Sequence, residues 1–216
     1  MLLARGRASL DEAAKELPGP CLALECDVAD AASIDRAFAA IAEEYGRIDV
    51  LINNAAATVP QLIAEVDAKR LEQEFRINFM GPVLVTKAAI PLLRTHGDGG
   101  VIINISSDSV PNPFLFLGFY ASAKAALETF SKALRTELRD DNIRVMVLRS
   151  GYVKDSSLST DWPEDIKQRY GAWMQKSGHM AHLGEPLDPD TVAKALFELA
   201  TLSPEASVDF IEFRPK

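Results

Sequence analysis

Short apolar segments alternate with longer amphipathic ones along the 216 residues of the chain. Most of the short segments are apolar at successive positions, as in Ile48–Ile52, where only Asp49 is polar. Strands of this kind are buried on both faces, which is typical of a parallel sheet covered by helices on both sides. The sequence therefore predicts a doubly wound, three-layer α/β fold with a mostly parallel sheet, and we expect one domain over residues 1–216.

The expected helices begin at recognisable capping residues. Asp30, Asp67 and Asp188 can each accept a hydrogen bond from a first helical turn, and Pro189 suits a first helical position. We expect helices at Ser9–Leu17, after Asp30, from Asp67 to about Arg94, at Phe119–Leu138 and at Pro189–Leu202. We expect strands at Met1–Ala4, Cys21–Cys26, Ile48–Ile52, Val101–Ile105, Ile143–Leu148 and Val208–Phe213.

Two of these helices carry more detailed predictions. In the helix after Asp30, spacings of three and four positions predict a buried stripe of Ile34, Phe38, Ile41 and Tyr45. In the helix Asp67–Arg94, Gly81-Pro82 is expected to disturb the middle. The residues expected to point inward there are Leu71, Phe75 and Phe79.

Charge and composition argue against several classes of protein. The net charge of −8 gives no basic surface for nucleic acid, and no apolar run approaches the roughly 18 residues that cross a membrane. Cys21 and Cys26 are expected to be small buried side chains rather than a disulfide or a reactive thiol, which fits a cytoplasmic protein. No cluster of ligands accompanies the histidines, so we expect no metal site and surface or lid positions for His96, His179 and His182.

Polar or small residues follow the expected strands at the ends that meet on one edge of a parallel sheet. Ligands of such folds bind at this edge. Strand ends are also polar simply because loops are solvated, so the pattern alone leaves the presence of a site open. The residues are Arg5, Asp27, Asn53-Asn54, Ser106-Ser107 and Ser150-Gly151.

Tyr120 and Lys124 are four residues apart in an expected helix and so share one face. A cation beside a phenol favours the phenolate and lowers the phenol pKa from its usual value of about 10. Ser107 ends an apolar strand and can direct its hydroxyl at the same carbonyl oxygen. The three side chains together can make a proton-transfer site for carbonyl/alcohol chemistry, although Tyr-x-x-x-Lys by itself is more often an exposed helix pair.

The chain resembles the short-chain dehydrogenase/reductase family over nearly its whole length, which implies a Rossmann-like fold. Cys26-Asp27-Val28 is similar to the segment that contacts adenine, and Asn53-Asn54-Ala55-Ala56 to the family's Asn-Asn-Ala-Gly. Phe75-Arg76-Ile77-Asn78 resembles the helix with the active-site Asn. Ser150-Gly151-Tyr152-Val153 resembles Pro-Gly-x-Val, with Asp155 where a Thr is usual. The family's Ser, Tyr and Lys are matched in type and spacing by Ser107, Tyr120 and Lys124.

The resemblance implies a role for each catalytic residue. Tyr120 would exchange a proton with the substrate oxygen during hydride transfer to or from nicotinamide, and Ser107 would hydrogen-bond that oxygen. Lys124 would lower the Tyr120 pKa and hold the nicotinamide ribose. Asn78 would position a water that links Lys124 to solvent, or else be a solvated helix residue. The residues implied in cofactor binding are Arg5, Asp27, Val28, Asn54, Ala55, Ala56, Tyr120, Lys124, Gly151 and Val153.

The first strand present bears on the choice of cofactor. An acidic residue commonly binds the ribose 2′-hydroxyl of NAD at such a strand end, whereas Arg suits the 2′-phosphate of NADP. Ala4-Arg5-Gly6-Arg7 has no acid here, and either arginine can bind phosphate. We therefore expect NADP rather than NAD.

The family's glycine-rich turn, which cradles the pyrophosphate, is absent, together with the strand before it and the helix after it. The absent strand belongs between the expected strands Met1–Ala4 and Ile48–Ile52, and without it both neighbours would carry unpaired backbone groups. Two explanations stay open. Either the sequence is a truncated form of a longer chain, or the short chain is real and its N-terminal region is rearranged or loose.

Two segments wall the substrate pocket in the family, and residues 155–186 are expected to be the second of these, a lid. Their apolar side chains favour an apolar or aromatic carbonyl or alcohol substrate, although core or subunit packing explains them equally well. The two longest expected helices pair across subunits in relatives, which implies a homodimer or homotetramer. The alternative function is a non-catalytic scaffold or inactive form that has lost phosphate binding. The apolar residues are Val110, Pro111, Pro113, Phe114, Leu115, Phe116, Leu117, Trp162, Tyr170, Trp173, Met174 and Met180.

Overall fold

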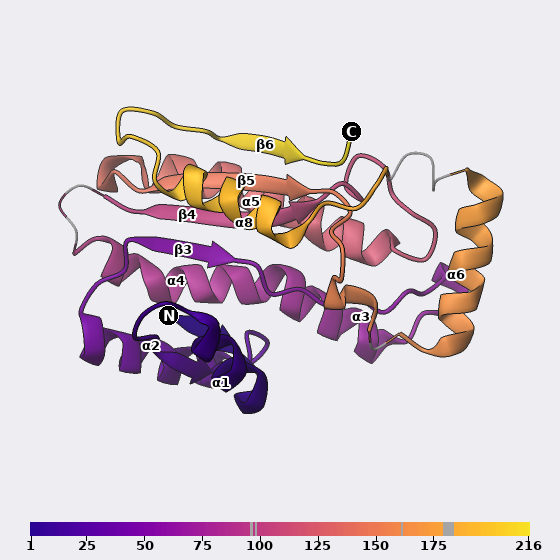
Figure 1. Ribbon diagram of the computed structural model, residues 1–216, viewed down its shortest axis with the longest axis horizontal. Helices are drawn as coiled ribbons and strands as arrows, with labels where there is room; N and C mark the ends of the chain where they lie inside the picture. Colours follow the sequence, from indigo (N-terminus) through magenta and orange to yellow (C-terminus); the bar gives the residue numbers. More distant parts are fainter. Residues whose placement is uncertain (96, 98, 161, 179–183) are drawn as a thin grey trace.

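The predicted parallel sheet is present, in two pieces. A computed structural model of the protein describes residues 1–95, 97, 99–160, 162–178 and 184–216 (Figure 1). Strands β3, β4, β5 and β6 form one sheet in that order, β1 and β2 form another, and all neighbours are parallel. The strands are β1 Leu2–Ala4, β2 Ala23–Glu25, β3 Val50–Asn53, β4 Val101–Ser107, β5 Arg144–Ser150 and β6 Phe210–Phe213.

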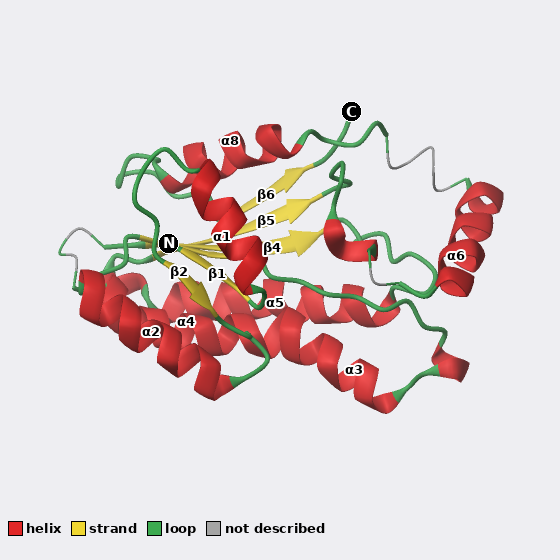
Figure 2. Ribbon diagram, turned by 60° about the horizontal axis from the view of Figure 1, so that its bottom comes forward, coloured by secondary structure: helices red, strands yellow, loops and turns green. Residues whose placement is uncertain are grey.

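Helices cover both faces of the larger sheet (Figure 2). Ile102 and Ile103 in β4 point to opposite faces because side chains alternate along a strand. Ile102 belongs to a core shared with α2, α4 and α5, and Ile103 to a core shared with Leu199 of α8. The α-helices are α1 Arg7–Glu16, α2 Ala31–Tyr45, α3 Ala68–Phe75, α4 Gly81–Leu93, α5 Gly118–Glu137, α6 Glu164–Ser177 and α8 Pro189–Ala200.

The three predicted helix caps are confirmed. The side chain of Asp30 accepts a hydrogen bond from the Ala32 backbone N–H at 3.0 Å. Asp67 accepts one from Arg70, and Asp188 accepts one from Asp190. Each cap satisfies a backbone donor that the first helical turn leaves without a partner.

The predicted disturbance in the long helix is confirmed as a π-helical turn, η2 (Arg76–Met80), which separates α3 from α4. The backbone N–H of Gly81 donates to the Arg76 carbonyl, and the next residue, Pro82, has no N–H. The predicted inward face of this helix is wrong. Leu71, Phe75 and Phe79 are only half-buried, whereas the buried residues are Glu74, Ile77 and Asn78.

Several other sequence expectations also differ from the structure. Tyr45 ends the predicted stripe of α2 but is 45% exposed, because it lies in the last turn of the helix, next to the capping residue Gly46. The strand expected over Cys21–Cys26 is shorter, Ala23–Glu25. Both cysteines are free and Cys26 is buried, as expected, whereas Cys21 is only half-buried. The short 3-10 turns and α6 were not predicted; the turns that flank the site are η1 (Ile63–Glu65) and η4 (Ser157–Ser159).

Strands β1 and β3 belong to separate sheets, and each pairs with one neighbour, β1 with β2 and β3 with β4. Each of the two strands has an exposed apolar side chain, Leu3 at 37% in β1 and Ile52 at 40% in β3. The N-terminal unit packs on the rest of the molecule through α2, which lies against α4. In addition, Gly81 lies so near the Val28 carbonyl that an added Cβ would be 2.8 Å from that oxygen.

None of the described helices is long and apolar enough to cross a membrane. Within the described ranges no three His, Cys, Asp or Glu side chains gather in a group that could hold a metal ion. The positions expected for His96, His179 and His182 lie outside the described residues.

Candidate active site

The candidate site lies where the carboxyl ends of β3, β4 and β5 meet. A buried polar network fixes the strands just below it: Asn53 Nδ2 donates to Asn104 Oδ1 at 2.8 Å, and Asn104 Nδ2 donates to Ser131 Oγ at 2.8 Å. Asn53 and Asn104 are directly opposite in the parallel register. Because these buried amides have partners in the adjacent strand and in α5, they fix the ends of β3 and β4 relative to each other and to α5.

Three predicted catalytic residues come together at this edge. Ser107 is the last residue of β4, and Tyr120 and Lys124 lie in the first two turns of α5. The Lys124 Nζ lies 5.7 Å from the centre of the Tyr120 ring. The Ser107 side chain lies close enough to the Tyr120 phenol to lower its pKa. The spacing of Tyr and Lys on one helix face therefore gives the expected juxtaposition.

The expected lowering of the Tyr120 pKa is wrong for this structure. Burial is the largest cause and raises the pKa of Tyr120 to about 12, against which the hydrogen bond from Ser107 lowers it. Lys124 is fully buried and donates from Nζ to the Ile105 carbonyl at 2.8 Å. Its burial lowers the pKa of Lys124 to about 8, since the charged form is disfavoured away from water.

Asn78 lies in the π-helical turn and has no exposed surface. Its Nδ2 donates to the Ala57 carbonyl at 2.6 Å and to the Glu74 carbonyl at 2.8 Å, while Oδ1 accepts from the Ala57 N–H at 3.2 Å. Asn78 therefore ties the helix to the loop after β3. The alternative expectation of a solvated helix Asn is wrong.

Glu74 is a buried acid that the sequence interpretation missed. Only 4% of it is exposed, and its carboxylate accepts from Thr58 Oγ1 at 3.0 Å and from the Val59 N–H at 3.5 Å. Burial, the largest cause, raises the pKa of Glu74 to about 7, and these two hydrogen bonds lower it. A signal was available in the sequence, because Glu74 precedes Asn78 by four residues and so shares its helix face.

A second carboxyl, Asp108, follows Ser107 directly. Burial raises the pKa of Asp108 above its ordinary value, and the hydrogen bond from Ser107 opposes this. The charges of Asp108 and Glu74 both raise the pKa of Tyr120. The charges of two acids, each with a pKa raised by burial, thus act on the phenol of Tyr120.

Apolar side chains cover Tyr120. It belongs to a buried cluster with Phe114, Leu117, Trp162 and Met174, against which Leu158, Tyr170 and Trp173 pack. Phe114 and Leu117 come from the segment between Ser107 and Tyr120, and the others come from η4, α6 and the residues before α6. Met180, expected in the same wall, lies outside the described residues.

The segment that contains α6 is joined to the residues after β3 at two places. The Trp162 indole N–H donates to the Thr58 carbonyl at 2.9 Å. Arg169 pairs with Glu65 through two contacts of 2.9 Å, and its guanidinium lies 5.2 Å from the ring centre of Phe116. Figure 1 shows α6 at the end of the molecule toward which the strand arrows point, as expected for a segment over the site.

The predicted cofactor residues lie along the same edge of the two sheets. Arg5 follows β1 and is exposed, whereas Arg7 is engaged in an ion pair with Asp11 at 2.8 Å. Asp27 and Val28 follow β2 and are half-buried, and the Asp27 side chain accepts a hydrogen bond from Ala29 in its own turn. The segment after β3 is exposed, at Asn54, Ala55 and Ala56.

Two further predicted residues follow β5. Gly151 donates its backbone N–H to the Phe213 carbonyl at 2.8 Å, and an added Cβ would lie 2.9 Å from the Arg214 Cβ. Val153 forms a parallel bridge with Leu187. The close packing of Gly151 explains its small size without any ligand.

The residues along this edge fit a dinucleotide in their chemistry. An exposed guanidinium at Arg5 suits a phosphate, and the buried Lys124 ammonium with the Tyr120 hydroxyl suits ribose hydroxyls at the other end. The exposed segment Asn54–Ala56 lies at the end of β3, and α5 carries Tyr120 and Lys124 beside the neighbouring strand β4.

Comparisons with known proteins agree with this arrangement. The chain is 35% identical to the uncharacterized oxidoreductase YusZ of Bacillus subtilis over 81% of this chain and 64% of that protein. It is 29% identical to the NADP-dependent 3-hydroxy acid dehydrogenase of Schizosaccharomyces pombe, over 91% of this chain and 74% of that protein. It matches the closed form of serine dehydrogenase complexed with NADP+ with a TM-score of 0.85 and 25% identity, covering 99% of this chain and 83% of that one.

The chain spans less than two thirds of the length of several curated relatives, YusZ among them. The family model for short chain dehydrogenase matches residues 1–167, most of the chain. On that match, together with the parallel sheet and the relatives above, the chain belongs to the short-chain dehydrogenase family.

Proposed function

We propose that this chain is an oxidoreductase that transfers hydride between NADP(H) and a carbonyl or secondary alcohol. The observation that carries the proposal is the constellation of Ser107, Tyr120 and Lys124, with Asn78 on the adjacent π-helical turn. When bound, the nicotinamide supplies or accepts the hydride. The chain's own residues orient the substrate oxygen and move its proton.

Tyr120 is the proposed proton donor in reduction and acceptor in oxidation. The Ser107 hydroxyl lies near the phenol, so a carbonyl oxygen placed between the two can accept from both. Lys124 is proposed to hold ribose hydroxyls, with Nζ turned from the Ile105 carbonyl. Asn78 is proposed to anchor the turn through which a water connects Lys124 to solvent.

The apolar cover supports a lid role for residues 155–186. Burial is the main cause of the high pKa of Tyr120, and Trp162 and Met174 belong to the same buried cluster as Tyr120. Movement of this segment would hydrate the phenol and lower its pKa toward the ordinary value of 10. The same side chains favour an apolar or aromatic substrate, because they would form its walls.

The choice of NADP rests on Arg5. Its exposed guanidinium, with no ion-pair partner among the described residues, can bind a 2′-phosphate in a bidentate manner. Arg7 is less suited because Asp11 already pairs with it. The similar S. pombe protein is an NADP-dependent dehydrogenase, and the similar serine dehydrogenase structure is a complex with NADP+; both support this proposal. Arg5→Ala should weaken NADPH binding at least tenfold and NADH binding little, as measured by quenching of protein fluorescence.

Loss of NADPH absorbance with a panel of aromatic and aliphatic ketones and aldehydes tests the activity. Tyr120→Phe should abolish turnover while NADPH affinity stays within a few-fold. Tyr152→Phe is the matched control, since Tyr152 is exposed and 46% accessible, and it should retain turnover. Full activity in the Tyr120→Phe protein would remove Tyr120 from the mechanism.

The divided sheet favours a second candidate function, a non-catalytic scaffold of the same fold that does not bind the cofactor.

The alternative is that the cofactor-binding form contains one more strand. We propose that in this form a further parallel strand lies between β1 and β3, each of which pairs with a single neighbour in the described residues. NADPH should then bind weakly to the 216-residue chain and well to a chain extended by a strand, a glycine-rich turn and a helix. Tight binding and turnover by the 216-residue chain, with its intact mass verified as 23.6 kDa, would contradict the need for that strand. Failure of both chains to bind would favour the scaffold.

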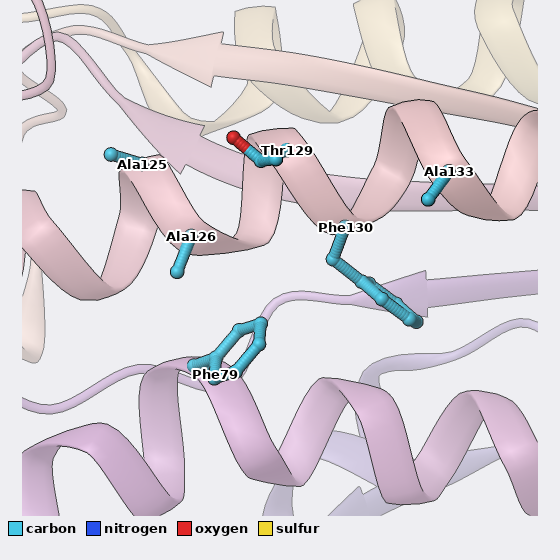
Figure 3. A pocket seen from close by; sticks show the side chains of 6 residues that line it. All are labelled: Phe79, Ala125, Ala126, Thr129, Phe130 and Ala133. Atoms are coloured by element: carbon cyan, nitrogen blue, oxygen red, sulfur yellow. The ribbon is translucent and has the colours of Figure 1, made fainter.

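A self-association surface is proposed on α5 and η2. Figure 3 shows Phe79 and Phe130 facing each other from the two helices, and their ring centres are 6.3 Å apart. Three alanines and Thr129 complete the groove: Ala125, Ala126 and Ala133. Small side chains allow a second helix pair to approach closely, so we expect a homodimer or homotetramer. Phe130→Glu should lower the molar mass measured by light scattering to that of one chain. A wild-type protein that already has the molar mass of one chain would contradict the proposal.

A further inference from the structure

Glu74, the buried acid beside the site, accepts hydrogen bonds from three residues. Its carboxylate binds the hydroxyl of Thr58 and the N–H of Val59, and its backbone carbonyl binds Asn78. Thr58 in turn accepts from the Trp162 indole N–H through its carbonyl. The Glu74 carboxylate thus contacts the loop Ala57–Val59, and this loop makes two further links. Ala57 hydrogen-bonds Asn78 in η2, and Thr58 hydrogen-bonds Trp162, which belongs to the apolar cluster around Tyr120.

The links are buried throughout. Thr58 is 5% exposed and Trp162 8%, so water competes little for either contact. Trp162 packs edge-to-face on Tyr170 with ring centres 5.2 Å apart, and both belong to the apolar group around Tyr120. A displacement of Thr58 would therefore act on an indole in the apolar cluster around Tyr120.

We propose that Glu74 is a positioning residue: through the Ala57–Val59 loop it sets the placement of Trp162 over Tyr120, and the gain or loss of its proton changes that placement. When Glu74 is ionised, the hydrogen bonds from Thr58 and Val59 are charge-assisted and hold the loop firmly. When Glu74 is protonated, both bonds weaken, and the loop holds Trp162 less closely.

The groups facing Glu74 permit such a change at neutral pH. Burial without a cationic partner keeps its pKa near 7, the two hydrogen bonds being the opposing causes. From α5, Tyr120 faces it and stays neutral at this pH, and Lys124 is turned to the Ile105 carbonyl. From the segment after β4, Asp108 acts on the same phenol. Ionised Glu74 raises the pKa of Tyr120, so protonation of Glu74 makes the phenol easier to ionise.

Tryptophan fluorescence of the free protein tests the proposal without cofactor or substrate. Trp173→Phe leaves Trp162 as the single indole, and replacing His96, His179 and His182 by Gln removes the side chains that ordinarily titrate near neutral pH. In this background the Trp162 emission should change with a midpoint near pH 7. The change should be absent from Glu74→Gln and retained in Glu72→Gln, an exposed acid on the same helix.

Two more variants test whether the fluorescence transition comes from Glu74 rather than from another acid or from misfolding. Thr58→Val removes a hydrogen bond that lowers the Glu74 pKa, so the midpoint should move upward by half a pH unit or more. Asp108→Asn should leave the midpoint in place. A transition that persists in Glu74→Gln, or one that Thr58→Val does not move, overturns the proposal. If Glu74→Gln fails to fold, the Thr58→Val midpoint decides.

A second arm rests on the proposed oxidoreductase activity. The pH profile of kcat/KM should show an inflection near pH 7 that Glu74→Gln lacks and Glu72→Gln keeps. An inflection that survives in Glu74→Gln would overturn the link to Tyr120. Absence of turnover in every variant would count against the proposed activity alone, because the fluorescence arm needs no turnover.

Discussion

Replacing Glu74 by Gln should stabilise the protein at alkaline pH, although it removes a charged side chain that makes hydrogen bonds. The pKa of this carboxyl is raised by burial from an ordinary value of 4.5 to about 7. The folded state therefore binds the proton more tightly than the unfolded state does. Stability from this group is fully present below pH 4.5 and is lost as the pH rises through about 7.

The magnitude follows from the same two pKa values. At about 1.4 kcal/mol for each unit of pKa, ionised Glu74 lowers the free energy of unfolding by about 3 kcal/mol above pH 8. Between pH 5 and pH 8.5 the loss is about 2.5 kcal/mol, because the unfolded carboxyl is already partly ionised at pH 5. The amide introduced by Glu74→Gln carries no charge and escapes this loss. Its oxygen can still accept from Thr58, while its NH2 faces the Val59 N–H at a pH-independent cost of about 1 kcal/mol.

Urea unfolding of wild type and Glu74→Gln at pH 5 and pH 8.5 measures the effect as a double difference. The variant should gain about 2.5 kcal/mol relative to wild type on going to pH 8.5, and every group common to both proteins cancels. Glu72→Gln is the control and should show a double difference near zero, because Glu72 is exposed. A double difference below about 0.5 kcal/mol for Glu74→Gln would refute the raised pKa as reasoned from its burial.

Three further predictions concern residues around the site. Gly81→Ala places a Cβ 2.8 Å from the Val28 carbonyl and should cost about 1–3 kcal/mol in urea unfolding, whereas Gly171→Ala, with open space around it, should not. Asn78→Ala loses the three hydrogen bonds to Ala57 and Glu74 and should cost about 2–4 kcal/mol of unfolding free energy, with turnover lost as well. Glu128→Ala leaves Arg149, which is 14% exposed at its side chain, with Glu212 as its remaining partner, and should cost about 2–4 kcal/mol by the same assay.

The sheet, the main helices and their caps could be predicted because they depend on local patterns. Runs such as Val101–Ile105 are apolar apart from Asn104, as expected for a strand buried on both faces. An Asp just before an amphipathic helical pattern favours an N-cap. Tyr120 and Lys124 could be paired because a helix fixes which residues share a face. Ser107 could be added because it ends an apolar strand and matches the family's Ser in type and spacing.

Other features depend on contacts between distant segments and were not predictable. Glu74 is buried because the loop Ala57–Val59 lies over α3. The spacing of four residues places Glu74 on the helix face of Asn78, but it does not reveal that this loop covers that face. The high pKa of Tyr120 likewise comes from burial, in a cluster that brings Tyr120 together with distant Trp162 and Met174. The inward face of α3 was misjudged because the loop Ala57–Val59 lies over the face of Glu74 and Asn78, and that contact joins segments distant in the sequence.

The separation of β1 from β3 has a consequence for how the molecule opens. The unit β1–α1–β2 has one buried apolar residue in its helix, Leu10, and is joined to the remainder through α2. A unit with so small a core can unfold locally while α5 and β4 stay intact. Amide hydrogens of β1 and β2 should therefore exchange by sub-global opening, well before those of β4. A strand inserted between β1 and β3 would merge the two sheets into one cooperative unit and, in the same step, complete the place where the cofactor phosphates are proposed to bind.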